Sequence, residues 1–176
     1  MIDFLKIDYL KDGNERQKAA FEVLTKHLVF EKLKNFNPIL TGTIPINIDI
    51  PESDLDIICF YPNKVDFIDR IVKNFGQEKN FQLKKTIIHD NETVIANFWI
   101  DEFEIEIFGQ NIPTTAQNAY KHMIIEQQIL TKMGEEFRLK IIKLKNDGYK
   151  TEPAFAMLLG LSGNPFNALL QLSFAI

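Results

Sequence analysis

The chain has 176 residues and a formal net charge of −4, with 45% hydrophobic and 25% charged residues. A chain of this size and composition can bury a sizeable core, which excludes a disordered chain, a collagen-like repeat and a small disulfide-linked scaffold. The acidic balance argues against non-specific binding to long nucleic acids or anionic membranes, because both need a cationic surface. The single cysteine, Cys59, excludes an internal disulfide.

The first residues carry aspartates and lack the basic and then apolar segments of a secretory signal. No apolar run reaches the ~18–20 residues that are needed to cross a bilayer. We therefore expect a cytoplasmic protein with no membrane partner.

The first expected element is an amphipathic helix over residues 14–36. Asn14 is the expected N-cap, because its side chain can accept a hydrogen bond from the first helical turn. Apolar side chains recur at every fourth position and form one stripe, at Ala20, Leu24 and Leu28.

Two strands are expected after this helix. A short strand ends at Gly42, and residues 54–60 form a second strand because they are mostly apolar and favour β structure. Between the two strands, residues 44–50 alternate isoleucine with other residue types, and this period of two favours extended backbone.

A helix over residues 64–75 and a meander of antiparallel strands complete the predicted sheet region. The three strands of the meander are expected at residues 82–89, 93–100 and 103–108. Helices are then expected at residues 115–132, at 135–146 and from about 152, with a last turn from Pro165. The fold class is therefore α+β, with a mixed sheet flanked by helices and a helical C-terminal third. We expect an α/β core over residues 1–113 and a helical region over 114–176, packed as one compact unit.

A pair of acidic residues opens the second predicted strand. Asp54 and Asp56 lie two residues apart, so their carboxylates share one face of the strand with their roots ~7 Å apart. Carboxylates this close repel one another, and a hard divalent cation relieves the repulsion. Two such ions ~3.5–4 Å apart can hold both oxygens of an in-line phosphoryl or nucleotidyl transfer. The pair therefore predicts a metal site.

Two residues before the acidic pair suit phosphate binding. Gly42 allows a backbone to approach a phosphate closely, and Thr43 offers a hydroxyl and an N–H group.

A third acid is expected from residues 101–108. Glu102, Glu104 and Glu106 share one face of this predicted strand, while apolar residues occupy the other face. We favour Glu106 because it lies deepest in the apolar part of the strand, and Glu104 is the close alternative.

These residues together resemble the signature of the nucleotidyltransferase superfamily related to DNA polymerase beta. That signature has a hydrophobic residue, a glycine and a small residue, then a loop and Asp-x-Asp. The matching residues are Leu40-Thr41-Gly42-Thr43 and Ser53-Asp54-Leu55-Asp56-Ile57. The resemblance implies that Gly42, Thr43 and Ser53 hold a nucleoside triphosphate (NTP). It also implies that Asp54, Asp56 and Glu106 are catalytic and bind Mg²⁺ or Mn²⁺.

Most of the chain also resembles a family of uncharacterised bacterial proteins allied to this superfamily. The similar blocks are residues 42–59, 103–110, 117–126 and 150–161. They carry further candidates for substrate contacts, which are Glu104, Gln110, His122 and Lys150. His122 and Glu126 are spaced i, i+4, which can suit two ligands of one metal, but a solvated or hydrogen-bonded pair is the preferred interpretation.

The sequence thus predicts a metal-dependent nucleotidyltransferase that moves a nucleoside monophosphate from an NTP to an unknown acceptor. The alternative is an inactive module of the same fold that binds a nucleotide or a protein partner. The acidic charge argues against a long nucleic acid as the acceptor. Lys145 is expected on a solvated helix face together with Lys140 and Lys143.

Overall fold

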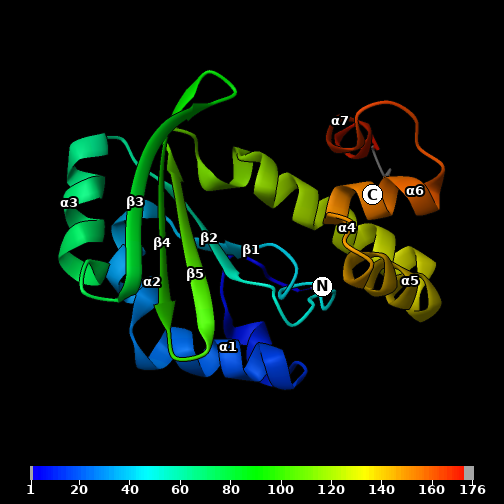
Figure 1. The fold of residues 1–176 in the computed structure, drawn as a ribbon, viewed down its shortest axis with the longest axis horizontal. Coiled ribbons are helices and arrows are strands. Elements are labelled where there is room, and N and C mark those ends of the chain that lie inside the picture. Colours follow the sequence, from blue (N-terminus) through cyan, green and yellow to red (C-terminus); the bar gives the residue numbers. More distant parts are fainter. Residues whose placement is uncertain (1, 173–176) are drawn as a thin grey trace.

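A computed structural model describes residues 2–172, and its centre is a five-stranded mixed sheet (Figure 1). The strands are β1 (Ile39–Thr41), β2 (Leu55–Phe60), β3 (Lys79–Ile88), β4 (Asn91–Ile100) and β5 (Phe103–Gln110). Their order across the sheet is β1-β2-β5-β4-β3. Strands β2 and β5 are parallel, and all other neighbours are antiparallel. The α+β class with a mixed sheet is therefore confirmed.

Helices cover the sheet and follow it in the chain. They are α1 (Glu15–Lys26), α2 (Val29–Leu33), α3 (Lys64–Phe75), α4 (Asn118–Met133), α5 (Glu135–Asn146), α6 (Thr151–Leu159) and α7 (Pro165–Leu170). Short 3₁₀ turns lie at Asp8–Asp12, Lys34–Phe36 and Thr114–Ala116. Helix α3, helix α5 and the β3–β5 meander lie where the sequence predicts them, with ends that differ by at most a few residues. None of the helices in residues 2–172 is long and apolar enough to cross a membrane.

Two hydrophobic clusters organise the molecule. The first joins α1, α2 and α3 to one face of the sheet, through residues such as Leu24, Phe67 and Ile105. The second lies among the helices α4 to α7 and also takes in Ile46 and Ile48 from the segment before β2. Figure 1 shows α4 to α7 gathered to one side of the sheet, away from α3. The division at residue 113 stays a prediction.

The predicted helix over residues 14–36 is wrong in its second half, because the helix is interrupted at Leu28, between the end of α1 and the start of α2. The N-terminus is as expected: Asn14 caps α1, and its Oδ1 accepts a hydrogen bond of 2.8 Å from the Gln17 backbone N–H. Leu28 adopts a left-handed conformation with φ of 53° and leaves its side chain 56% exposed. The apolar stripe therefore ends at Leu24, and Val29 starts a new short helix that turns back to the core.

Substituting Leu28→Asn is expected to stabilise the protein. The left-handed conformation costs a non-glycine residue roughly 1–2 kcal/mol, and asparagine tolerates it better than leucine. Because Leu28 is exposed and precedes α2, the change should raise the free energy of unfolding by roughly 0.5–1 kcal/mol in urea titrations. Leu139→Asn, at an exposed position inside α5, is the control and should lower it through poorer helix propensity. A loss of stability in both variants would contradict the account.

The extended backbone predicted for residues 44–50 is wrong in its first part, because residues 44–47 form a turn. The Asn47 N–H donates to the Ile44 carbonyl at 3.2 Å, and Asn47 has a positive φ of 58°. Side chains satisfy the turn: Gln17 Nε2 donates to the carbonyls of Ile44 and Pro45 at 2.9 and 3.2 Å. Ile44 packs in the first hydrophobic cluster, whereas Ile46 and Ile48 pack in the second. The alternating isoleucines therefore reflect two cores rather than one strand.

Candidate active site

A row of polar side chains crosses the sheet on the face opposite the first hydrophobic cluster. Residues that are Cα partners on neighbouring strands point to the same face. The partners in this row run from β1 to β3 and are Thr41, Asp56, Glu106, Asn97 and Gln82. The neighbouring residues Ile57, Ile107 and Ala96 point to the other face and are fully buried. The row is therefore a polar surface supported from behind by the core.

The structure brings together Asp54, Asp56 and Glu106. Asp56 and Glu106 are direct partners across the parallel β2–β5 pair, and Asp54 precedes β2 on the same side by strand parity. Burial is the main cause that raises the pKa of each of the three carboxyl groups. The negative charges of Asp54 and Glu106 raise the pKa of Asp56 further, to well above its usual range.

Glu106 has one polar partner in the same row. Asn97 Nδ2 donates a long hydrogen bond of 3.4 Å to Glu106 Oε2, and this contact lowers the pKa of Glu106. Burial and the charges of Asp54 and Glu104 outweigh it, so the pKa of Glu106 is raised overall. The register thus separates Glu106, which is the Cα partner of Asp56, from Glu104, which lies two residues earlier in β5 and pairs with Trp99.

Gly42 lies directly against the acidic group. Its φ is 80°, and a Cβ built at this position would lie 2.2 Å from Asp56 Oδ2. A glycine is therefore required both by the left-handed backbone and by the carboxylate beside it.

The hydroxyls of Thr43 and Ser53 close the loop that leads from Gly42 to the acidic pair. Thr43 Oγ1 donates to Ser53 Oγ at 3.1 Å, and the Ile50 N–H donates to the same Ser53 oxygen at 3.0 Å. These bonds hold the start of β2 beside the turn that follows β1. They fix the position of Asp54 relative to Gly42.

Lys145 is buried and its charge acts on Asp56, so the expectation of a solvated face is wrong for this residue. It lies in α5, is only 7% exposed and donates from Nζ to the Ile48 carbonyl at 2.8 Å. Burial lowers the pKa of Lys145 to about 8, against the charges of Asp49, Glu126, Asp56 and Asp54, which raise it. A signal was present, because positions 137, 141 and 145 are spaced by four and the first two are apolar.

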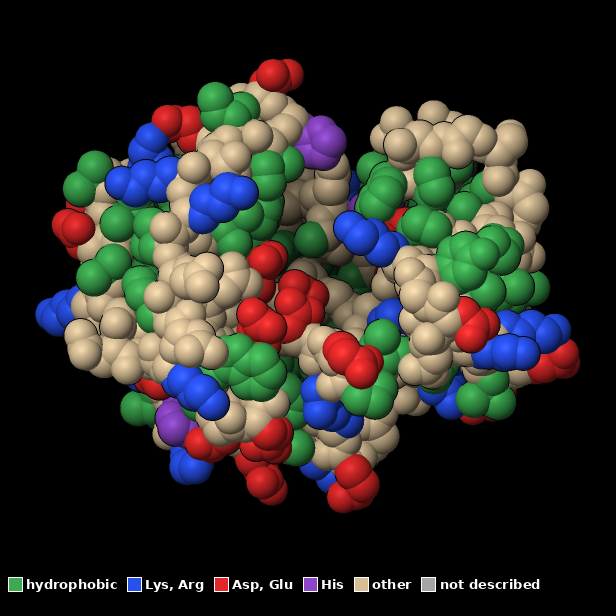
Figure 2. Space-filling model, in the orientation of Figure 1, with side chains coloured by type: hydrophobic (Ala, Val, Ile, Leu, Met, Phe, Trp, Pro, Cys, Tyr) green, Lys and Arg blue, Asp and Glu red, His purple; other side chains and the backbone are tan. Residues whose placement is uncertain are grey.

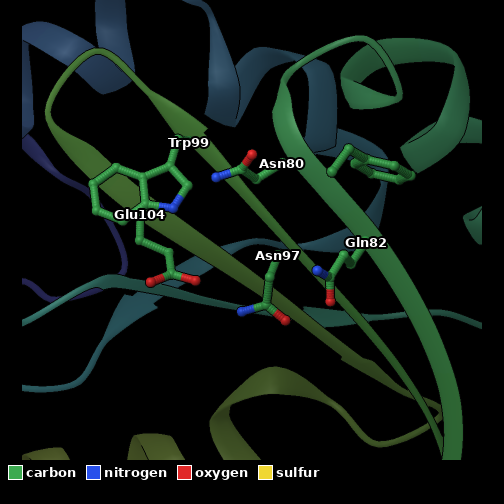
Figure 3. A pocket seen from close by; sticks show the side chains of 6 residues that line it. Asn80, Gln82, Asn97, Trp99 and Glu104 are labelled. Atoms are coloured by element: carbon green, nitrogen blue, oxygen red, sulfur yellow. The ribbon is translucent and has the colours of Figure 1, made fainter.

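A polar pocket opens next to the row, with a volume of about 350 Å³ (Figure 3). It is lined by residues of β3, β4 and β5, namely Asn80, Phe81, Gln82, Asn97, Trp99 and Glu104. Figure 3 shows the Trp99 indole beside the Glu104 side chain, with the amides of Asn97 and Gln82 next to each other. The pocket thus combines a flat aromatic surface, several amides and one carboxylate.

The remaining candidates for substrate contacts are more dispersed. Gln110 is buried at the end of β5, and its Nε2 donates to Thr93 Oγ1 at 2.8 Å. Lys150 is exposed and precedes α6 without a side-chain cap. His122 and Glu126, expected as a solvated or hydrogen-bonded pair, are 6% and 4% exposed, so the solvated alternative is wrong.

The molecular surface is hollowed and acidic between the sheet and the C-terminal helices (Figure 2). Figure 2 shows acidic side chains gathered in a hollow between the sheet and the C-terminal helices, with basic side chains on the far rim. The charges of Lys145 in α5 and Glu152 in α6 both affect the pKa of Asp56, so the helical region forms the second wall of this hollow.

The fold that carries this row is the nucleotidyltransferase fold. The solved structure of the GLD-2/RNP-8 complex matches 86% of this chain and 57% of that chain, with a TM-score of 0.51 and 13% identity. A structure of Cid1 poly(U) polymerase with MgGTP bound matches 78% of this chain and 42% of that chain, with a TM-score of 0.51 and 12% identity. Another Cid1 structure, whose description names RNA terminal uridylyl transferase activity, matches 74% of this chain and 40% of that chain, with a TM-score of 0.52 and 14% identity.

These likenesses confirm the predicted relationship at the level of the fold. The chain spans about half the length of the structures that it matches. The chain belongs to the family described as "Domain of unknown function (DUF4269)", whose model matches residues 22–172. No curated protein matches it in sequence.

Proposed function

We propose that this protein is a metal-dependent nucleotidyltransferase that transfers a nucleoside monophosphate from an NTP to an acceptor hydroxyl or phosphate. The observation that carries the proposal is the convergence of Asp54, Asp56 and Glu106 beside Gly42, on a sheet of the nucleotidyltransferase fold.

The three carboxylates fit a magnesium or manganese ion. Hard dications prefer carboxylate oxygens, and the mutual repulsion that raises the pKa of Asp56 is relieved by a bound cation. Asp54, Asp56 and Glu106 would hold the metal. When bound, the metal would neutralise charge on the triphosphate and stabilise the attacking and leaving oxygens.

The residues of the chain would position the reactants. The turn at Gly42 and Thr43 offers backbone N–H groups to the triphosphate, and Lys145 adds positive charge from the helical wall. The acceptor oxygen attacks the α-phosphorus, the bond to the β-phosphate breaks, and pyrophosphate leaves. Glu106 would either complete the metal site or accept the proton of the acceptor hydroxyl. For the second role, burial raises its pKa in the metal-free protein toward the range of an effective general base.

The pocket beside Glu106 supports a compact, polar acceptor. Its amides on Asn80, Gln82 and Asn97 can both donate and accept hydrogen bonds, and Trp99 offers a face for a ring. The carboxylate of Glu104 favours a neutral or cationic acceptor over a polyanion, which agrees with the net charge of −4.

The proposal is tested by pyrophosphate release from each common NTP in the presence of Mg²⁺ and a pool of hydroxylated small molecules. Thermal shifts run in parallel, because a bound ligand at a hundredfold excess over its Kd adds about 2.7 kcal/mol of stability. An enzyme shows both a Mg²⁺-dependent shift and pyrophosphate release. A shift without release indicates the inactive nucleotide-binding module. The absence of both signals would contradict both functions.

Glu106→Gln and Glu104→Gln form a matched pair that separates the two candidate third acids. Glu106→Gln should lower transfer by roughly 10²-fold or more, the usual range for losing a general acid–base group. Glu104→Gln should leave kcat within a few-fold and raise the KM of the acceptor, because Glu104 lines the pocket. Initial rates of pyrophosphate release measure both effects. A larger loss of kcat in Glu104→Gln would show that the assignment is reversed.

A further inference from the structure

A second group of side chains of metal-ligand type lies in the helical region, on elements other than those that carry the carboxylates of the sheet. His122 and Glu126 face each other one turn apart on α4, and Glu152 reaches them from the first turn of α6. Ligand atoms of the three side chains all lie within 4.8 Å of one another. The three residues are defined here as the α4–α6 cluster.

The cluster is enclosed by the protein. His122 and Glu126 are 6% and 4% exposed, and Glu152 is half-buried. The ring of Phe166 in α7 meets the His122 ring edge-on, with ring centroids 6.1 Å apart. The second hydrophobic cluster, which includes Met123 and Phe155, packs around the same helices. Water therefore has limited access to these polar atoms.

Two of these polar atoms have no partner in the described part of the chain. They are His122 Nδ1 and Glu126 Oε1, and both are buried. Leaving a buried polar atom without a hydrogen bond costs roughly 1–3 kcal/mol, so native proteins rarely do so. The nearby cation Lys145 does not supply the missing contact: its Nζ donates to the Ile48 carbonyl, and Glu126 Oε1 has no hydrogen-bond partner among the described residues. The unpaired atoms of two ligand-type side chains, both within the α4–α6 cluster, point to a ligand that the protein itself does not provide.

We propose that His122, Glu126 and Glu152 bind one divalent transition-metal ion, for which Zn²⁺ is the best match. A dication neutralises the two carboxylates while it fills the unmet bonding capacity of the imidazole and of Glu126. The imidazole nitrogen selects zinc and its neighbours over Mg²⁺, which prefers oxygen ligands only. Three protein ligands, two of them one helical turn apart, leave a further position open for water or substrate.

This ion would join α4 to α6 and brace the helical wall of the hollow. The charge of Glu152 contributes to the raised pKa of Asp56, so an ion on Glu152 would also reduce the negative field at the sheet carboxylates. The proposal does not rest on nucleotidyl transfer, since the α4–α6 cluster shares no residue with Asp54, Asp56 and Glu106.

The test is a titration of the full chain, stripped with a chelator, with Co²⁺ and then Zn²⁺. Co²⁺ reports its ligands through visible absorption bands, and Zn²⁺ should displace it. With excess Mg²⁺ present throughout to occupy the sheet carboxylates, we expect one equivalent of Co²⁺ to bind and Zn²⁺ to replace it. Zn²⁺ should also raise the melting temperature.

Variants assign the site. His122→Asn and Glu126→Gln should each weaken Co²⁺ and Zn²⁺ binding at least tenfold. His89→Asn, at an exposed histidine, should keep the wild-type titration. Circular dichroism checks folding, and Glu152→Gln, at the half-buried ligand, replaces any variant that fails to fold. Overturning results are a wild-type chain that binds no Co²⁺ or Zn²⁺, or binding that is lost in Asp54→Asn/Asp56→Asn and kept in His122→Asn.

Discussion

Replacing Asp54 and Asp56 together by asparagine is expected to abolish Mg²⁺-dependent NTP binding while the metal-free protein becomes no less stable. In the complex, these carboxylates would be main ligands of the metal, and their loss removes the counter-charge of the triphosphate. Because metal catalysis contributes several kcal/mol, any transfer activity should fall by roughly 10³-fold or more.

The stability part of this prediction follows from the sign of the pKa shifts. The pKa of Asp54 and that of Asp56 are raised in the folded protein, so the folded state binds more protons than the unfolded chain as the pH rises from acid to neutral. Stability therefore falls as the pH rises through the folded-state values, and the charged pair opposes folding near neutral pH. The double variant carries no charge at these two positions, so it lacks this loss of stability near neutral pH. Its advantage should vanish below about pH 4, the value for an unfolded aspartate.

Melting curves in a chelator and in Mg²⁺ with NTP, each at neutral and acidic pH, measure both parts. The control is Asp12→Asn/Asp69→Asn, which removes two exposed aspartates and the same formal charge. The control should keep the ligand-induced shift. If Asp54 and Asp56 only capped a turn, their loss would cost ~1 kcal/mol and leave ligand binding intact. A double variant that melts lower in the chelator and keeps the full shift would thus defeat the proposed function.

Gly42→Ala should damage both the fold and the site, whereas Gly160→Ala should damage the fold alone. Both glycines have positive φ, 80° and 66°, so alanine at either position meets a backbone strain of roughly 1–2 kcal/mol. At Gly42, the new Cβ also lies 2.2 Å from Asp56 Oδ2 and must displace that carboxylate. At Gly160, nothing lies within 4 Å of the new atom.

The pair of glycine variants isolates the effect on the metal site from the effect on the backbone. Urea unfolding should show comparable losses of stability. Only Gly42→Ala should weaken the Mg²⁺-dependent response to NTP, by roughly tenfold or more if the carboxylate moves off its position. Equal ligand responses in the two variants would mean that Gly42 serves the turn and not the site.

Local patterns were sufficient to predict most elements of the fold. The helix at Lys64–Phe75 follows from apolar positions spaced by three and four, and the β3–β5 meander follows from alternation interrupted by short polar turns. These signals are contained within each segment, so the sequence alone carries them.

The failures come from long-range packing. Residues 44–47 look like a strand because isoleucine alternates, yet their side chains are divided between two cores, and Gln17 from α1 satisfies their carbonyls. Leu28 breaks a helix whose pattern continues through it, so that Val29 can reach the core. Neither arrangement has a local signal.

In the candidate site, too, some residues could be predicted from local patterns and others depend on long-range packing. Strand parity was enough to place Asp54 and Asp56 together, and Gly42 followed from the motif. Sequence left Glu104 and Glu106 open, because only the register of the parallel β2–β5 pair sets Glu106 opposite Asp56. The burial of the α4–α6 cluster depends on how the C-terminal helices pack together, which a single sequence does not specify. For Lys145, the only local signal is its spacing of four from the apolar residues Ile141 and Phe137.

The most direct test of the central claim is anomalous scattering from crystals grown with Mn²⁺ and an NTP analogue that cannot transfer its α-phosphate. We predict a manganese peak bounded by the carboxylates of Asp54, Asp56 and Glu106, with the triphosphate against the backbone of Gly42 and Thr43. The account is contradicted if nucleotide is bound elsewhere, or if these three carboxylates hold no manganese while the triphosphate occupies another surface of the protein.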